Sequence, residues 1–297
     1  MSALRSIWRN TRRAIGGRRT FGVYVALVVV IILVAVFAKQ IAPMDPYTAN
    51  LSDAFQPPSA EHWFGTDKLG RDIASRIVYG TRISLTSAMI LVLTISVVGS
   101  FLGVVAGYFG GLVDAVIMRI CDMMISFPGI VLAIAVAGLL GASIRNAIIA
   151  IAVVSWTKYA RLARSLVLKI RHSDFVTAAE LSGTRPGRLM RRYLLPSALP
   201  TLVITAATDI GTMMLELAGL SFLGFGAQPP QAEWGLMLNE GRAYLLDSPW
   251  LMIFPGAAIS VTVIVFNLLG DALRDILDPR HAGQDEDVVE LVPAPLS

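Results

Sequence analysis

Long runs without a charged residue are the feature of this sequence that most restricts its fold. Asp, Glu, Lys and Arg are absent from residues 21–38, 83–112, 123–144 and 248–270. A helix of about 20 apolar residues crosses the hydrocarbon layer of a bilayer, so each run can span a membrane. The chain is 55% hydrophobic and 15% charged, whereas soluble domains are roughly 25% charged. We therefore expect an integral membrane protein.

Two further runs are apolar but interrupted by charge. Residues 146–157 lead directly into Lys158, and residues 194–226 contain the acids Asp209 and Glu216. Counting both, the pattern predicts six transmembrane helices in an all-α polytopic membrane protein. The first run also ends in a passable signal-cleavage site at Ala38, but it is long for a signal core and five further spans follow it.

The distribution of basic residues predicts the orientation. Residues 1–20 carry six arginines and no acid, and residues 158–200 carry nine Lys or Arg against two acids. Basic loops stay in the cytoplasm, so both regions and both termini are expected there. The predicted organisation has five parts: a basic cytoplasmic N-terminus at 1–20, a first transmembrane helix at 21–38, an external segment at 39–82, a five-helix core at 83–272 with a cytoplasmic loop at 165–198, and a cytoplasmic tail at 273–297.

Cysteine and histidine content excludes a metal centre built from these residues. The chain has one cysteine, Cys121, and three histidines far apart, His62, His172 and His281. It also lacks the Gly-x4-Gly-Lys-Ser/Thr pattern of a phosphate-binding loop. If ATP drives this protein, a separate subunit must bind it.

Glycine and proline positions predict close helix contacts and bends. Gly99, Gly103 and Gly107 recur every four residues, which places small residues on one helical face where another helix can approach closely. Contact within one bundle and contact between subunits are equally compatible with this pattern. Pro128 and Pro255 fall inside expected spans and should kink them.

The basic loop contains signals for two short helices joined by a turn. Asp174 can cap the first helix, and Gly183 suits the left-handed position that ends it. Thr184 can cap a second helix with Pro186 in its first turn, and this helix should end near Pro196.

Each short helix has a distinct face. The first should present a narrow apolar face of mostly small residues, which would let it sit deep in a partner's groove: Phe175, Ala178, Ala179 and Ser182. The second should present a basic face: Arg185, Arg188, Arg191 and Arg192. By composition alone, an amphipathic loop lying on anionic lipid is an equally good interpretation.

The loop also carries three residue groups at fixed intervals, with three positions between the first two groups and nine between the last two: Thr177-Ala178-Ala179, Gly183 and Tyr193-Leu194-Leu195-Pro196. This pattern resembles the EAA loop of ABC-importer permeases, with Thr177 in place of the usual Glu and Tyr193 in place of Ile. The resemblance implies that the loop is a coupling loop whose first helix docks into a cleft on a cytoplasmic ATPase. The residues expected to carry this contact are Thr177, Ala178, Ala179, Gly183, Leu195 and Pro196.

Four other segments resemble the second permease subunit of dipeptide, oligopeptide and nickel importers: residues 62–72, 75–85, 221–238 and 267–279. The resemblance implies a type I ABC importer permease fold in a bacterial inner membrane, with no catalytic residue, metal or cofactor in this chain. It implies as partners a second homologous permease, two cytoplasmic subunits that bind ATP-Mg and an external solute-binding protein, and no nucleic acid. The expected cargo is a short peptide, with nickel or a metal chelate as the alternative.

Acids within the fifth expected span are candidates for the translocation pathway. Asp209 and Glu216 are seven residues apart and share one side of a helix, with Met213 between them. Intramembrane acids usually face a polar cavity, although each can instead pair with a neighbouring helix. Near the third span, Arg119 and Asp122 are expected to form a local pair.

Two other classes of function are disfavoured. An intramembrane hydrolase using Asp209 and Glu216 would place its carboxylates roughly 10 Å apart along the helix, too far to share a proton. A self-sufficient secondary transporter usually shows two related halves, and no internal repeat is evident.

Overall fold

The computed structural model describes residues 21–171 and 173–277, and these residues are helical or irregular apart from one isolated bridge between Thr66 and Asp72. The predicted N-terminus at 1–20, most of the tail at 273–297, His172 and His281 lie outside the described residues. The elements follow a first helix, Phe21–Val36, in this order: α2 (Ala38–Ile41), η1 (Leu51–Asp53), α3 (Ile73–Phe109), α4 (Gly111–Ile125), α5 (Gly129–Leu140), α6 (Ile144–Ile170), α7 (Asp174–Leu181), α8 (Pro186–Leu189), η2 (Met190–Leu194), α9 (Leu195–Phe222), α10 (Trp234–Gly241), η3 (Arg242–Tyr244) and α11 (Trp250–Leu277).

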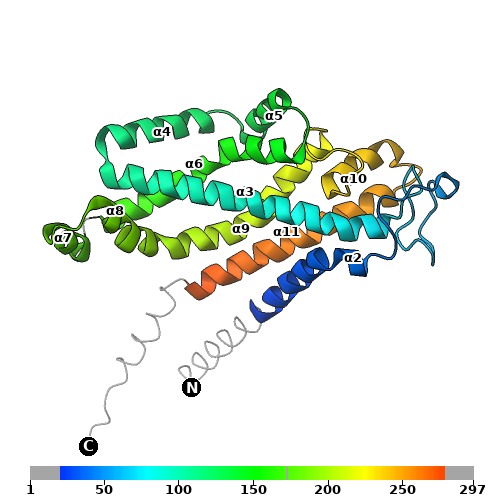
Figure 1. The fold of residues 1–297 in the computed structure, drawn as a ribbon, viewed down its shortest axis with the longest axis horizontal. Coiled ribbons are helices and arrows are strands. Elements are labelled where there is room, and N and C mark those ends of the chain that lie inside the picture. Colours follow the sequence, from blue (N-terminus) through cyan, green and yellow to red (C-terminus); the bar gives the residue numbers. More distant parts are fainter. Residues whose placement is uncertain (1–20, 172, 278–297) are drawn as a thin grey trace, which may run out of the picture.

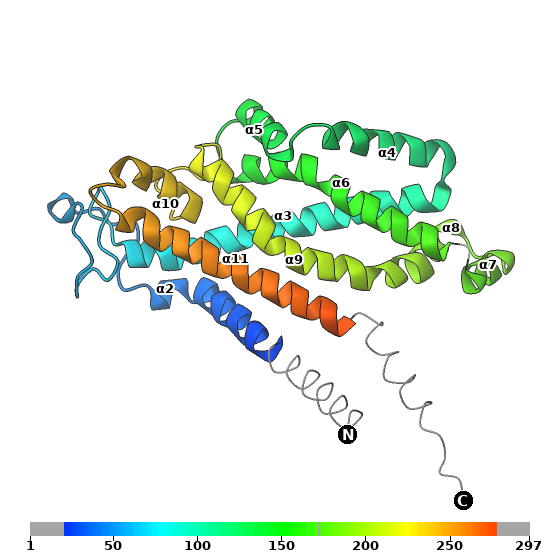
Figure 2. The ribbon, with the colours of Figure 1, turned by 180° about the vertical axis from the view of Figure 1, so that it is seen from behind.

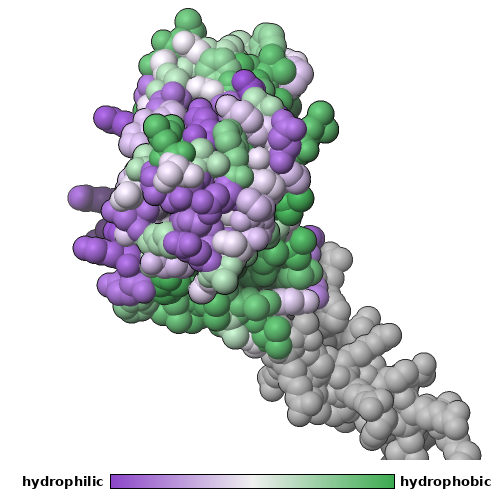
Figure 3. All heavy atoms as spheres, turned by 90° about the vertical axis from the view of Figure 1, so that its right-hand side faces the viewer, coloured by the Kyte–Doolittle hydropathy of each residue, from purple (hydrophilic) through white to green (hydrophobic). Residues whose placement is uncertain are grey.

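The long helices run along one axis and leave a different set of short elements at each end. Figures 1 and 2 show α7 and α8 at one end, called here the α7 end. The loops around residues 42–72 lie with α2 and α10 at the other, called here the α10 end. Viewed from the α10 end, hydrophilic side chains gather over the middle and the left edge of the face, with hydrophobic ones at its top and bottom (Figure 3). A polar end on an apolar bundle is what a membrane protein presents to water.

Fewer helices qualify as complete membrane spans than the sequence predicts. Within the described residues, three are long and apolar enough to cross a membrane, namely α3, the continuous Pro186–Phe222 rod and α11. The bent α4–α5 pair makes a fourth if it is counted as one span. The first helix, Phe21–Val36, is apolar but shorter.

The second span begins ten residues earlier than its uncharged run. The run starts at residue 83, but α3 begins at Ile73, where the Asp72 side chain accepts a hydrogen bond from the Ser75 N–H (2.7 Å) and caps the helix. Arg76 lies inside α3 and is 1% exposed, because Glu240 pairs with its charge. Residues 73–82 of the segment predicted to be external therefore belong to α3.

The third predicted span, at 123–144, is not one helix. α4 already begins at Gly111; φ is left-handed both there (52°) and at the preceding Gly110 (63°). It ends at Ile125, and α5 starts directly after Pro128 at an angle of 92° to it. Proline cannot continue the hydrogen-bond ladder of a helix, so the predicted kink at Pro128 is a complete break. Pro255, by contrast, lies within the unbroken α11.

The predicted glycine face of α3 packs against α6 of the same chain. A Cβ atom built on Gly99 would lie 2.3 Å from the Trp156 carbonyl oxygen, and one built on Gly103 would lie 2.2 Å from the Ala160 carbonyl oxygen. One built on Gly107 would lie 2.9 Å from Val167 Cβ. The two backbones are thus in direct contact, and the interpretation as packing within one bundle is confirmed.

Adding a single methyl group at this contact should destabilise the protein. We expect Gly103→Ala to lower the stability by about 1–3 kcal/mol, because the new Cβ meets backbone that cannot rotate away. The thermal unfolding midpoint of the purified protein in detergent would measure the effect. Gly22→Ala is the matched control, since nothing lies within 4 Å of a Cβ at that helical glycine. Equal midpoints for the two variants would contradict the contact.

Candidate functional site

The first loop helix, α7, begins at Asp174, one residue earlier than predicted. The Ser173 carbonyl accepts the N–H groups of Val176 and Thr177, both at 3.0 Å, so Ser173 precedes the helix and Asp174 is its first residue. Asp174 therefore does not occupy the cap position itself. Its carboxylate remains in the first turn, where the helix dipole stabilises a negative charge.

Gly183 ends α7 as predicted. Its φ is +76°, in the left-handed region, and the Thr184 N–H donates to the Ala179 carbonyl at 3.1 Å. This bond over five residues is the mark of a Schellman C-terminus, in which glycine supplies the left-handed residue at no steric cost. Gly183 thereby fixes the direction in which the chain leaves α7.

The second loop helix differs from the prediction at both ends. Arg185, not Thr184, is its N-cap residue and makes no side-chain cap bond, while Pro186 sits in the first turn as predicted. The helix does not end near Pro196. The Leu195 N–H donates to the Met190 carbonyl in a π-helical turn, and α9 follows with Pro196 in its first turn, where the missing N–H is tolerated.

The buried and exposed residues of α7 do not match the apolar face that the sequence predicts. Val176 is completely buried and Ala179 is 9% exposed, so these residues hold the helix against the bundle. Phe175, Thr177 and Ala178 are exposed. Ala179 therefore belongs to the inner face, and the outer face remains available at the α7 end. All four arginines of the predicted basic face, Arg185, Arg188, Arg191 and Arg192, are exposed.

The acids of the fifth predicted span differ in their surroundings. Asp209 is 3% exposed; Lys158 Nζ donates to its Oδ1 at 2.6 Å, and the Tyr159 hydroxyl donates to its Oδ2 at 2.9 Å. This carboxylate therefore pairs with α6. Met213 is 5% exposed and belongs to the core, whereas Glu216 is half-buried. Of the three predicted pathway residues, only Glu216 reaches a surface of the chain.

Ion pairs also join α4 to α6. Arg161 binds Asp122, and Arg164 binds Asp114 through two hydrogen bonds. The predicted local pair of Arg119 with Asp122 is therefore wrong. Asp122 pairs instead with Arg161, four to five turns into α6, because α4 and α6 lie side by side and their side chains meet directly.

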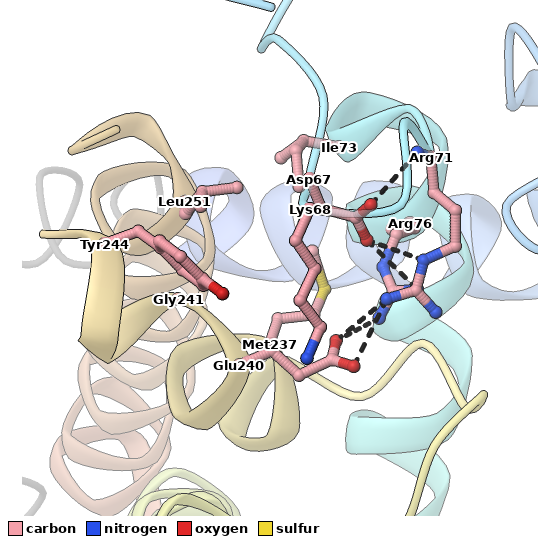
Figure 4. A pocket seen from close by; sticks show the side chains of 10 residues that line it. All are labelled: Asp67, Lys68, Arg71, Ile73, Arg76, Met237, Glu240, Gly241, Tyr244 and Leu251. Atoms are coloured by element: carbon pink, nitrogen blue, oxygen red, sulfur yellow. Dashed lines mark hydrogen bonds and ion pairs between the residues drawn. The ribbon is translucent and has the colours of Figure 1, made fainter. Parts of the chain in front are cut away.

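A buried ion cluster at the α10 end connects segments far apart in the sequence (Figure 4). Arg71 Nε donates to Asp67 Oδ2 at 2.6 Å, and Arg71 Nη2 lies 3.2 Å from both oxygens of Glu240. Arg76 Nη2 donates to Glu240 Oε2 at 2.8 Å. Both arginines are at most 2% exposed. The cluster thus fastens the loop before α3 to α10.

Further polar contacts strengthen the same end. His62 Nδ1 lies 3.1 Å from Asp72 Oδ1, and the Trp234 indole N–H donates to the Ile77 carbonyl at 3.0 Å. Glu233 caps α10 by accepting the N–H groups of Gly235 and Leu236. Burial raises the pKa of the Glu233 carboxyl, and these hydrogen bonds oppose that shift.

Sequence reasoning did not identify this cluster as a unit. Its members lie in two of the segments that carry the family resemblance, residues 62–72 and 75–85, and just beyond a third, residues 221–238. Their position in or near these segments could have marked them as important, but nothing in the sequence pairs Arg71 or Arg76 with Glu240. Within residues 21–171 and 173–277, no three His, Cys, Asp or Glu side chains are grouped so as to hold a metal ion.

Comparison with known families gives two matches along the chain. Residues 99–283 match the family described as the binding-protein-dependent transport system inner membrane component. Residues 6–58 match the N-terminal transmembrane domain of oligopeptide transport permease C. The two matches include the coupling loop and the segments at 221–238 and 267–279, whereas the segments at 62–72 and 75–85 lie between them.

Individual relatives are similar over nearly their whole length. The dipeptide transport system permease protein DppC of Alkalihalophilus pseudofirmus is 42% identical, covering 93% of this chain and 90% of that protein. The nickel transport system permease protein NikC of Escherichia coli K12 is 44% identical (88% and 95%). The glutathione transport system permease protein GsiD of Pectobacterium atrosepticum is 40% identical (94% and 93%).

A solved structure has a similar fold. An inward-facing form of the MetNI methionine ABC transporter contains a chain that matches with a TM-score of 0.55 and 22% identity, covering 67% of this chain and 95% of that one. At this identity the match concerns the fold alone.

Removing the shared carboxylate of the ion cluster should destabilise the α10 end. We expect Glu240→Ala to cost about 3–5 kcal/mol, because two buried guanidinium groups would be left with Asp67 alone. Limited proteolysis of the 42–72 loops and the unfolding midpoint would both report it. Glu61→Ala removes an exposed acid from the same segment and serves as the control. If Glu240→Ala resists proteolysis and heat as well as this control does, the ion cluster does not stabilise the α10 end.

Proposed function

Because this chain belongs to the family of binding-protein-dependent transport system inner membrane components, we propose that it moves short peptides across the bacterial inner membrane by alternating access. It is the permease of an ABC importer and not itself an enzyme, and the ATPase is a separate subunit. The observation that carries the proposal is similarity at 40–44% identity over most of the chain to permeases of this kind. The cycle would require a second related permease, two ATPase subunits and an external binding protein.

The proposed cargo follows from the relatives. DppC is named for dipeptide transport, and the match at residues 6–58 is named for oligopeptide transport. NikC, named for nickel transport, is equally similar in identity and supports nickel or a metal chelate as the alternative cargo. Peptide is preferred because more of these names describe peptides.

The proposed membrane topology has six spans with both termini in the cytoplasm. The α4–α5 pair would make one broken span, and α6 and the first helix, Phe21–Val36, would complete the set. Non-helical backbone within a membrane is tolerated where protein surrounds it, so the break between Ile125 and Gly129 is compatible with this topology. The basic α7 end would face the cytoplasm, in line with its exposed arginines.

We further propose that the outer face of α7 docks into a cleft of the ATPase. Phe175, Thr177 and Ala178 are exposed there, while Val176 and Ala179 hold the helix to the bundle. The Phe175 and Tyr193 rings lie 6.5 Å apart, so movement of α7 would be passed to the start of α9. Gly183, Leu195 and Pro196 would act by shaping the loop rather than by contact.

The translocation pathway is proposed to run beside α9, as the sequence suggested. Glu216 would line it directly. Asp209 would contribute through its bond with Lys158, and Met213 would support the wall from beneath.

A charged bulky residue on the outer face of α7 should block docking. Since Ala178 is exposed, Ala178→Arg should fold and insert normally yet lose at least about tenfold in ATPase association, the effect of a charge that has no partner in an apolar contact. Co-purification in mild detergent measures the association. Leu246→Arg is the matched control, since Leu246 is also an exposed apolar residue (95% exposed) and lies at the α10 end.

The same purification tests the function itself. With the unmodified chain, we expect a second permease, the ATPases and a binding protein to co-purify, and the ligand held by that binding protein to be a peptide. A nickel complex in its place would select the alternative cargo. If the chain purifies alone, even after cross-linking at Ala178, the importer function and the docking of α7 on an ATPase are both contradicted.

A further inference from the structure

A polar stripe runs along the middle of α9. Its members follow one another at intervals of four, three and four residues, so they share one side of the helix: Thr205, Asp209, Thr212 and Glu216. Thr212 is exposed, and Thr205 and Glu216 are half-buried. Polar groups on a membrane-spanning helix face a partner or a water-filled cavity, because hydrocarbon cannot solvate them. The Thr205 hydroxyl bonds to the Thr201 carbonyl of its own helix, so it is the two acids that mark this side of α9 as one that lipid does not cover.

Lys158 of α6 adds a cation to this surface. Its side chain is 58% exposed, although Nζ is bonded to the buried Asp209. An ammonium group has three donors, and the bond to Asp209 uses one of them. The second oxygen of that carboxylate already accepts the Tyr159 hydroxyl, which leaves the other two donors of Lys158 for further partners. Lys158 can thus accept a second anionic partner without losing the first.

Glu216 supplies the opposite charge on the same surface. It interacts electrostatically with both Lys158 and Asp209, so the charges of these three groups influence one another. Asp209 and Glu216 are seven residues apart, which is roughly 10 Å along the helix. The surface therefore offers a cation at one level and a carboxylate about two turns further toward the α10 end.

This spacing corresponds to the length of a small peptide. An extended chain spans at most about 3.3–3.6 Å per residue, so two or three residues separate the terminal charges by roughly 7–11 Å. A peptide with free ends carries an ammonium and a carboxylate at those positions. A bare divalent cation would be attracted by Glu216 but repelled by Lys158.

We propose that Lys158 and Glu216 form a bipolar subsite that binds the carboxylate and ammonium ends of a short zwitterionic peptide during its passage. The inference rests on the proposed function and makes it specific, because it assigns the two residues that distinguish a zwitterion from a metal ion. Asp209 is a positioning residue that holds Lys158 in place. Thr205 and Thr212 keep the wall polar between the two charges.

The test uses the complete transporter, reconstituted in vesicles with its co-purified permease, ATPases and binding protein. Uptake of radiolabelled dialanine is compared with uptake of nickel chloride. One test variant is Glu216→Gln. The other combines Lys158→Met with Asp209→Asn, which removes both charges together, so no buried carboxylate is left unpaired. The matched control combines Arg161→Met with Asp122→Asn, another α6 ion pair whose side chains are 47% and 52% exposed.

We expect dialanine uptake at limiting concentration to fall about tenfold or more in each test variant, the effect of one lost hydrogen bond to a charged group. The control should stay within about twofold of the unmodified transporter. ATPase activity stimulated by the loaded binding protein should be retained in all variants. Any nickel uptake should fall with Glu216→Gln and not with the double variant.

The outcomes separate the inference from the function on which it rests. Unchanged dialanine uptake in Glu216→Gln, with ATPase stimulation intact, would overturn the bipolar subsite and leave the importer assignment standing. An equal loss in the control pair would also overturn it, since any α6 ion pair would then suffice. Failure of the unmodified transporter to import dialanine, with nickel imported instead, would overturn the proposed peptide cargo.

Discussion

The direct backbone contact between α3 and α6 is the constraint on which the rest of the structure depends. Gly99 and Gly103 bring α3 against carbonyl groups of α6, and no larger residue fits there. α3 carries Arg76 of the ion cluster near its start, and α6 carries Lys158 and then leads into α7. One close contact therefore sets the relative positions of the α10 end, the charged surface in the middle and the loop at the α7 end.

Two of the buried charges within the long helices are each neutralised by another element. Arg76 is tolerated within α3 because Glu240 of α10 meets it, and Asp209 is tolerated within α9 because Lys158 and Tyr159 of α6 bond to it. Unpaired charges in a low-dielectric interior are costly, so these pairs hold the helices in register as well as satisfying the charges. Glu216 is half-buried and forms no ion pair or hydrogen bond with any residue of 21–171 or 173–277, which is why it stands out as a cargo contact.

The sequence predicted some parts of the loop and missed others for identifiable reasons. Gly183 could be assigned because a left-handed residue after a short amphipathic run depends on local chemistry alone. The expected stop near Pro196 was wrong because proline is tolerated in a first turn, and the π turn ending at Leu194 allowed the helix to continue. The inward side of α7 was missed because the burial of Val176 depends on how α7 folds back against α8, which the spacing of residues within α7 does not reveal.

The sequence by itself determined the class of protein, its helical content and its family. Those properties follow from uncharged runs and spaced motifs, which depend on solvent transfer and local backbone chemistry. Only the tertiary structure decided where α3 begins, that residues 123–144 are broken at Pro128, and which partners Asp122, Asp209 and Glu240 take. The physical reason is that a charge's cost depends on what faces it, and helix packing brings together residues that sequence separation keeps apart.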